Sequence, residues 1–200
     1  MAASRSIRNF RIVMWALVVL AAGVATWLYV FNPPARPLGV TGQDFVVNNS
    51  KGGAFTQDDL AGVPTLVFFG YTFCPDVCPT TLAETTAWRA QLGLTADDLR
   101  IIFVSVDPER DTIAKVKEYV EGFDETIVGL VAAGLEQNDN IKRAFGVFSE
   151  KNGEPGDDYY LVDHTAMSFL LDKDGVFKGT ISYGEDSKST LGKLAMLVNG

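Results

Sequence analysis

An uninterrupted apolar stretch stands near the start of the chain. Residues 12–31 contain no charged side chain, and a helix of that length spans about 30 Å, the thickness of the hydrocarbon core of a bilayer. Trp15 lies near one end of the stretch, and Trp27 and Tyr29 lie near the other, as is typical of aromatic residues at membrane interfaces. The pattern predicts a single transmembrane anchor over 12–31.

A cleaved signal peptide and a buried core helix are weaker interpretations of this stretch. The apolar region of a signal peptide has only about 7–15 residues and ends in small side chains, whereas this run ends in the bulky residues 27–31. A core helix would not require the basic tail of residues 1–11 or the Pro-rich segment 32–37, which we interpret as a linker. The positive-inside rule then keeps the tail in the cytoplasm and exports residues 38–200.

Beyond the linker, short apolar runs alternate with segments of helical periodicity. The continuous apolar runs at 65–69 and 101–106 are typical of strands buried on both faces. Further strands are predicted at 45–47, 54–55, 127–131, 167–171 and 176–183, and helices at 83–94, 113–123, 141–145 and 191–198. This order predicts one α/β domain over 38–200, with a thioredoxin-like fold related to that of the peroxiredoxins.

Charge and composition narrow the classes of function. The part of the chain after the apolar stretch holds 14 basic and 25 acidic residues, a net charge of −11, which argues against a sequence-independent nucleic-acid binder. The chain has two cysteines and one histidine. These counts exclude a zinc finger, a four-cysteine iron–sulfur site and a three-histidine zinc site.

The two cysteines are placed for chemistry rather than for structural support. Cys74 and Cys78 are four residues apart, directly after a buried strand and before a predicted helix, so their side chains share one face. The start of a helix lowers the pKa of a thiol and favours the thiolate, which is both the nucleophile and the metal ligand. A structural disulfide between them is the weaker alternative, because closing so short a loop removes little entropy from the unfolded chain.

The single histidine, His164, follows the cysteines by some 90 residues. A lone histidine is more often a surface or core residue than a ligand, but in a thioredoxin-like fold the loop before the C-terminal hairpin packs against the cysteine loop. We therefore expect His164 to lie near the thiols. Two thiolates and an imidazole form a soft set of three ligands that suits Cu(I), can hold Cu(II) and can also bind zinc.

Three ordered motifs give the chain a family resemblance. They are Gly70-Tyr71-Thr72-Phe73-Cys74-Pro75-Asp76-Val77-Cys78-Pro79, Val104-Ser105-Val106-Asp107-Pro108-Glu109-Arg110-Asp111-Thr112 and Asp163-His164-Thr165. Together they resemble the SCO/SenC copper chaperones over roughly residues 38–198. The resemblance implies copper ligands at Cys74, Cys78 and His164. Many members of the family have His at the position of Phe73, which is not one of the three ligands.

The resemblance also implies a role and partners. The family delivers copper to, or prepares, the dinuclear copper centre of cytochrome c oxidase, so the expected partner is the copper-carrying subunit of the oxidase. A periplasmic copper donor or a thioredoxin-like reductant is a further expected partner. The layout predicts a single-pass protein of the bacterial inner membrane, with its N-terminus in the cytoplasm and its domain in the periplasm.

Three carboxylates are candidates for tuning the predicted site. Asp163 can orient the imidazole of His164, although alternation along a strand can equally point it the opposite way. Asp107 follows a buried strand, together with Glu109, Arg110 and Asp111, at the edge where α/β sites form. The alternative for these four residues is a turn with a helix cap and a local ion pair. Asp76, between the cysteines, can raise their pKa or face a basic partner, or is a solvated loop residue. Met167 is a weak candidate ligand and is interpreted as a core residue.

Three functions are compatible with these residues. The leading one is a copper chaperone that uses Cys74, Cys78 and His164. The alternative is a dedicated thiol–disulfide reductase, in which Cys74 and Cys78 reduce the cysteines of the oxidase copper site. The third is an interaction module with a passive disulfide. The sequence leaves open whether the protein is an enzyme.

Overall fold

The protein is described from a computed structural model that covers residues 2–31, 39–153 and 159–200. The chain divides into two compact units, Met1–Arg36 and Pro37–Gly200. The linker predicted at 32–37 lies outside the described residues.

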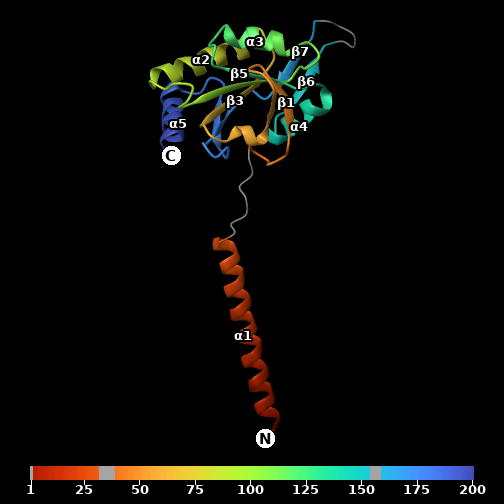
Figure 1. The fold of residues 1–200 in the computed structure, drawn as a ribbon, viewed down its shortest axis with the longest axis vertical. Coiled ribbons are helices and arrows are strands. Elements are labelled where there is room, and N and C mark those ends of the chain that lie inside the picture. Colours follow the sequence, from red (N-terminus) through yellow and green to blue (C-terminus); the bar gives the residue numbers. More distant parts are fainter. Residues whose placement is uncertain (1, 32–38, 154–158) are drawn as a thin grey trace. The chain divides into compact units, whose positions relative to one another are not determined.

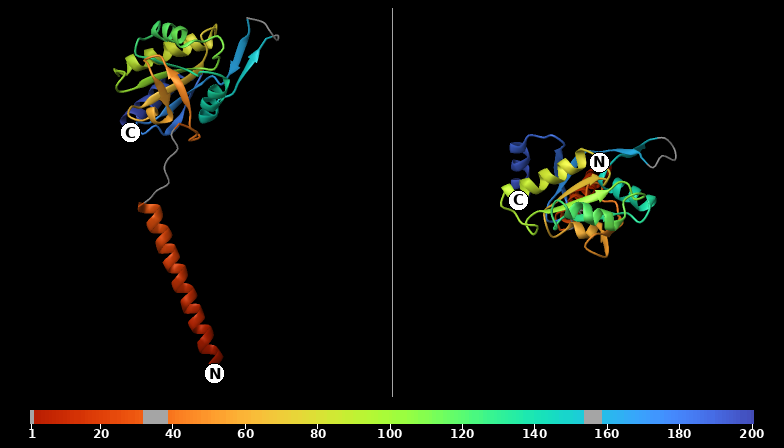
Figure 2. Two further views of the ribbon diagram at one scale, coloured as in Figure 1. Left: turned by 45° about the vertical axis from the view of Figure 1, so that its right-hand side comes forward. Right: turned by 90° about the horizontal axis from the view of Figure 1, so that it is seen from above.

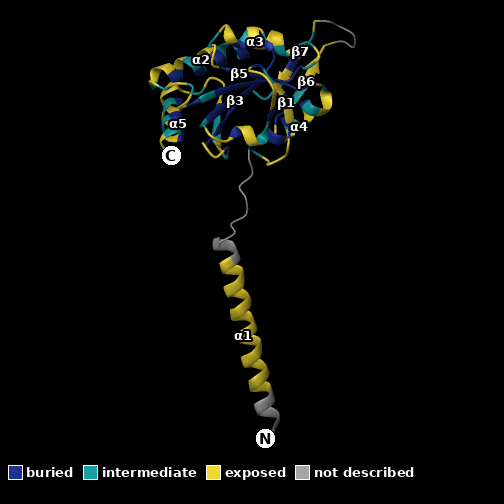
Figure 3. Ribbon diagram, in the orientation of Figure 1, coloured by how far each residue is buried: buried dark blue, intermediate teal, exposed yellow. Residues whose placement is uncertain are grey.

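The first unit contains one helix, α1 (Ala2–Phe31). Its stretch Ile7–Trp27 is long and apolar enough to cross a membrane, as judged by length and composition. The helix is longer than the predicted anchor because the basic tail is helical as well. Within this unit, every described side chain from Ile7 to Trp27 is exposed (Figure 3), which is compatible with a membrane anchor.

The second unit is built on a seven-stranded sheet in the order β2-β1-β5-β4-β3-β8-β9 (Figure 1). The strands are β1 (Val46–Asn49), β2 (Ala54–Thr56), β3 (Thr65–Gly70), β4 (Arg100–Ser105), β5 (Val128–Val131), β8 (Met167–Leu171) and β9 (Phe177–Ser182). Strands β3, β4 and β5 are parallel to one another, and β8 and β9 continue the sheet in antiparallel pairing. The predicted strands are thereby confirmed.

The helices cover both faces of this sheet. They are α2 (Val77–Gln91), α3 (Ile113–Glu121), α4 (Leu135–Phe145) and α5 (Ser187–Asn199), with a short 3₁₀ helix at Gln57–Leu60. Helices α2 and α3 lie over one face (Figures 1 and 2). The consecutive residues Phe68 and Phe69 show why the central strand is apolar throughout, because Phe68 contacts Phe103 while Phe69 contacts Phe145 of α4.

A separate two-stranded sheet, which we call the β6–β7 hairpin, was not predicted. It pairs β6 (Ser149–Asn152) with β7 (Leu161–His164), and Figure 2 shows it standing away from the main sheet. The prediction that His164 lies in a loop is wrong, since His164 is the last residue of β7. These strands lack a clear apolar pattern because β6 is polar and largely exposed and β7 has one buried position.

Candidate metal centre

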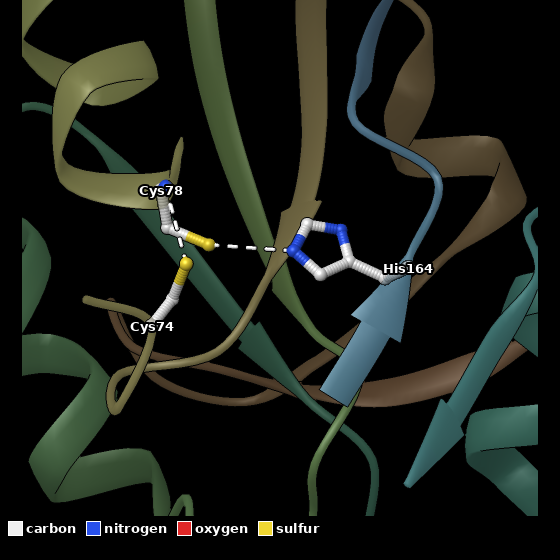
Figure 4. A group of neighbouring side chains, drawn as sticks. All are labelled: Cys74, Cys78 and His164. Atoms are coloured by element: carbon white, nitrogen blue, oxygen red, sulfur yellow. Dashed lines mark hydrogen bonds between the residues drawn. The ribbon is translucent and has the colours of Figure 1, made fainter. Parts of the chain in front are cut away.

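The end of β3, the loop after it and the start of α2 place both cysteines. Strand β3 ends at Gly70, Cys74 is half-buried in the loop, and Cys78 is fully buried in the first turn of α2. Both thiols are free. The sulfur atoms of Cys74 and Cys78 and a ring nitrogen of His164 all lie within 4.8 Å of one another (Figure 4). The structure therefore brings the three residues of the predicted ligand set together.

His164 is held in one orientation. Its Nδ1 lies 3.1 Å from the carbonyl oxygen of Thr165, and because a carbonyl can only accept, Nδ1 carries the hydrogen. The lone pair of Nε2 then faces the sulfur of Cys78 at 3.5 Å. The aromatic rings of Phe68 and Tyr71 meet the imidazole edge-on, with centroids 6.1 and 5.9 Å away. The ring nitrogen that can bind a metal therefore points at the thiols.

The two thiols are inequivalent and share one proton. The hydrogen bond from the Cys78 thiol lowers the pKa of Cys74 to about 4 despite its partial burial. The backbone N–H of Cys78, in the first turn of α2, also donates to the Cys74 sulfur at 3.3 Å. The bond to Cys74 and the burial of the side chain both raise the pKa of Cys78. Cys74 is therefore the thiolate of the pair and Cys78 the thiol.

Gly70 provides the space for the Cys78 sulfur. A Cβ atom at this position would lie 2.7 Å from that sulfur and 2.9 Å from the ring of Phe103, closer than van der Waals contact allows. In the sequence, Gly70 directly follows the apolar run 65–69 and begins the motif that holds both cysteines. A glycine between a buried apolar strand and a cysteine loop is the signal that would have identified this close approach.

Asp111 holds the cysteine loop against the end of β4. Its buried carboxylate accepts hydrogen bonds from the backbone N–H and hydroxyl of Thr72, at 3.1 and 2.5 Å, and from the hydroxyl of Ser105 at 2.6 Å. Burial raises the pKa of Asp111. These bonds fix the segment that enters the Cys74 loop. Asp111 lies after the predicted strand at 101–106, but the sequence did not indicate what it contacts.

The three carboxylates proposed to tune the site lie in different surroundings. Asp107 is buried and binds the Arg110 guanidinium and the Tyr160 hydroxyl. Asp76 is exposed at the N-terminus of α2, and its side chain makes no capping bond. Asp163 is exposed and accepts a hydrogen bond from Asn152 at 3.3 Å.

Asp163 is not brought to the imidazole of His164. Consecutive residues of β7 face opposite sides of the strand, so the Asp163 side chain lies on the side of Asn152 in β6. The carbonyl of Thr165 orients the ring instead. Met167 packs against the core, and Phe73 is 51% exposed beside Cys74.

The donor set is chemically selective. Two sulfur atoms and one imidazole nitrogen favour soft or borderline ions such as Cu(I), Cu(II) and zinc over the hard ions Mg²⁺ and Ca²⁺. Deprotonated thiols are the metal-binding form, and the Cys74 thiolate is already available. Cys74 and His164 are only partly buried, so the set is not sealed from solvent.

Comparison with known proteins places these features in a family. The family model described as SCO1/SenC matches residues 34–199. A SCO2-like protein of Rickettsia felis is 30% identical over 178 residues, which cover 84% of this chain and 86% of that protein. The human mitochondrial protein SCO1 homolog is 36% identical over 138 residues, 68% of this chain and 46% of its own length.

Solved structures agree with the fold. The structure of Bradyrhizobium japonicum ScoI with copper bound matches with a TM-score of 0.68 and 37% identity, over 77% of this chain and 97% of that one. Yeast Sco1 with copper bound matches with a TM-score of 0.69 and 30% identity, over 81% and 90%. The thioredoxin-like fold predicted from the order of elements is thereby confirmed.

Proposed function

Since the chain belongs to the SCO1/SenC family, we propose that it carries copper on Cys74, Cys78 and His164 and hands it to the copper-carrying subunit of cytochrome c oxidase. The observation that carries this proposal is the convergence of two sulfur atoms and one lone-pair nitrogen within 4.8 Å. Relatives of the same fold at 30% and 37% identity have been solved with copper bound, which supports copper as the cargo.

In this proposal each ligand has its own role. The Cys74 thiolate is half-buried and meets incoming copper first, and Cys78 then loses its proton as it becomes the second sulfur ligand. The lone pair of His164 Nε2 completes the set from β7. Because Cys74 and His164 are partly exposed, cysteines of a docked partner can replace these ligands one at a time, so that copper passes on without being released into solution.

The inequivalent thiols also support a second candidate function, thiol–disulfide reduction. The Cys74 thiolate would attack a disulfide of the target protein and form a mixed disulfide, releasing one target thiolate. Cys78 would then give up its proton and attack Cys74, which releases the second target thiolate. Two electrons pass to the target and leave a Cys74–Cys78 disulfide, which a thioredoxin-like reductant would reduce again. This activity is compatible with copper carriage, because copper binds the reduced pair.

We place the protein in the bacterial inner membrane through α1, with its N-terminus in the cytoplasm and the domain in the periplasm. Partners that act on the domain, whether a copper donor, a reductant or the oxidase subunit, would then meet it on the outer side of the membrane. The supporting features are the apolar stretch Ile7–Trp27 and the basic residues at its N-terminal end.

Copper titration of the reduced full-length protein in detergent tests the proposal. Wild type should bind one equivalent of Cu(I) or Cu(II), and His164→Ala should weaken binding by more than about 100-fold, beyond the loss typical of residues that only support a ligand. Glu150→Ala, an exposed substitution on the same hairpin, is the matched control and should bind as wild type does. Unchanged affinity in His164→Ala would remove the three-ligand site and leave reduction as the better function.

A further inference from the structure

The strand that carries His164 does not pair with any described strand of the main sheet. Strand β7 pairs with β6 in a two-stranded sheet separate from the seven-stranded sheet that leads to the cysteines. An isolated two-stranded hairpin is marginally stable in water. His164 lies three residues before the start of β8 in the main sheet. The distance between His164 and the thiols therefore depends on this chain connection and on the side chains that tie the β6–β7 hairpin to the rest of the domain.

Among the described residues, Arg110 makes several of these ties. Its Nε donates to the buried carboxylate of Asp107 at 2.5 Å, and its Nη1 donates to the carbonyl oxygen of Tyr160 at 2.8 Å. The guanidinium carbon lies 3.5 Å from the centroid of the Tyr160 ring, and the Tyr160 hydroxyl returns to Asp107 at 2.8 Å. Tyr160 directly precedes β7, so this network fixes the start of the strand that ends at His164.

The same guanidinium also faces the cysteine loop. It lies 5.7 Å from the ring of Tyr71 and 5.0 Å from that of Phe73, at distances where a cation is attracted to an aromatic face. The hydroxyl of Tyr71 accepts the backbone N–H of Val162 in β7 at 3.2 Å, and its ring contacts His164. Arg110 thus contacts the cysteine segment through Tyr71 and Phe73 and the His164 segment through Tyr160.

From these contacts we infer that Arg110 is a positioning residue that sets His164 against the two thiols, an inference that rests on the proposed copper site. It acts through β7 and is not itself a ligand. A planar guanidinium can stack on Tyr160 while it donates in two directions, and a lysine ammonium cannot reproduce that arrangement. Arg110→Lys keeps the charge, but it is expected to lose much of the positioning of His164 against the thiols.

The test compares copper affinity in matched variants of the full-length protein in detergent. Arg110→Gln should bind copper about 10-fold to 100-fold more weakly than wild type, the range for residues that orient a ligand. Arg89→Gln is the control, because Arg89 is likewise paired with a carboxylate, that of Asp124, and is buried outside the metal site. Arg89→Gln should keep wild-type affinity, and equal affinity in wild type and Arg110→Gln would overturn the inference.

A double-mutant cycle shows whether Arg110 acts through His164. In a His164→Ala background, adding Arg110→Gln should cause no further loss of copper affinity, since the ligand it positions is gone. A loss as large as in the wild-type background would refute the positioning role. Failure of the proposed function looks different, because wild type and His164→Ala would then bind copper equally.

The copper-free protein gives an independent readout. The chain has one histidine, so specific labelling yields one set of imidazole nitrogen resonances. Wild type should show the Nδ1–H form that the Thr165 carbonyl holds, and Arg110→Gln should shift these resonances toward a mixture of tautomers. Arg89→Gln should leave the resonances in place. Identical imidazole resonances in wild type and Arg110→Gln would contradict the inference whatever the copper affinities are.

Discussion

At the scale of single residues, the two thiols differ more than their common motif suggests. Cys74 is half-buried and accepts hydrogen bonds from the thiol and the backbone N–H of Cys78. Cys78 has no exposed surface. The consequence is one reactive thiolate and one protected thiol four residues apart, which suits stepwise metal transfer and disulfide exchange equally.

This difference predicts the pH dependence of alkylation in the reduced protein. An ordinary thiol, with a pKa near 8.5, loses reactivity about tenfold per pH unit below that value. Because the pKa of Cys74 is lowered to about 4, its alkylation by iodoacetamide should stay nearly constant from pH 8 to pH 5 and fall only as the pH approaches 4. Peptide mass spectrometry after timed labelling measures the rate at each cysteine.

Two variants control that measurement. Cys74→Ser should show almost no labelling, because the remaining thiol is buried and protonated. Cys78→Ala removes the largest cause of the lowered Cys74 pKa and should move the fall in reactivity toward neutral pH. A wild-type rate that already drops tenfold between pH 8 and pH 7 would contradict the shared-proton description.

The residue types predicted the three ligands but not the groups that hold these ligands in position. Cys74, Cys78 and His164 have side chains that bind soft metals, so a search of the sequence can find them. The group that orients His164 is the backbone carbonyl of Thr165, and a carbonyl occurs in every residue and leaves no signature. Asp163 was the natural candidate by type, but the pleat of β7 turns its side chain toward Asn152.

At the scale of elements, the site depends on one loop that comes after β4. Its Asp111 binds Thr72 in the cysteine loop, while its Arg110 and Asp107 bind Tyr160 next to β7. The cysteine loop and the strand that carries His164 are therefore both anchored to the same short segment, which follows the central strand β4.

Removing the carboxylate of Asp111 should destabilise the domain. Asp111→Ala leaves the part-buried backbone N–H and hydroxyl of Thr72, and the buried hydroxyl of Ser105, without their acceptor. Each buried polar group left unpaired costs about 1–3 kcal/mol, although relaxation reduces the sum, so we expect a loss of about 3 kcal/mol in the free energy of unfolding. Urea denaturation followed by circular dichroism measures it.

Asp98 is the matched control for this prediction. It also accepts hydrogen bonds from the backbone N–H and hydroxyl of one threonine, Thr95, but in an exposed position. Asp98→Ala should lower the free energy of unfolding much less than Asp111→Ala does, because water replaces the lost acceptor. Equal destabilisation by the two substitutions would show that burial of the Asp111 network contributes little.

The predictability of each element depends on how far it is buried. Strands β3 and β4 lie under helices on both faces, so nearly every position is apolar and the run is visible in the sequence. The β6–β7 hairpin has polar, exposed positions in β6 and one buried position in β7. The hairpin segment contacts Tyr71 and Arg110, far away in the chain, and no local pattern of the sequence records these contacts.

At the scale of the whole molecule, a basic N-terminal segment precedes an acidic domain. Residues 1–31 hold three arginines and no acid, and the remainder has a net charge of −11. Positive charge beside an apolar helix favours the cytoplasmic side during insertion. The two parts are therefore expected on opposite sides of the membrane.

A reporter fusion tests this topology. The full-length chain, with alkaline phosphatase fused after Gly200 and expressed in a bacterium, should fractionate with the membrane and show high enzyme activity, because the reporter folds correctly only outside the cytoplasm. Deletion of residues 7–27 should release the fusion from the membrane and abolish that activity. An intact, membrane-bound and inactive fusion would show that the domain faces the cytoplasm.

The sequence by itself determined the apolar helix, the order of the buried strands and the identity of the candidate ligands. These depend on the local pattern of apolar residues and on the chemistry of cysteine and histidine side chains. The tertiary structure decided that His164 ends a separate hairpin, that the Thr165 carbonyl fixes its tautomer, and that Arg110 joins both halves of the site. These features are contacts between segments distant in the chain or involve backbone atoms common to all residues, and folding alone brings them together.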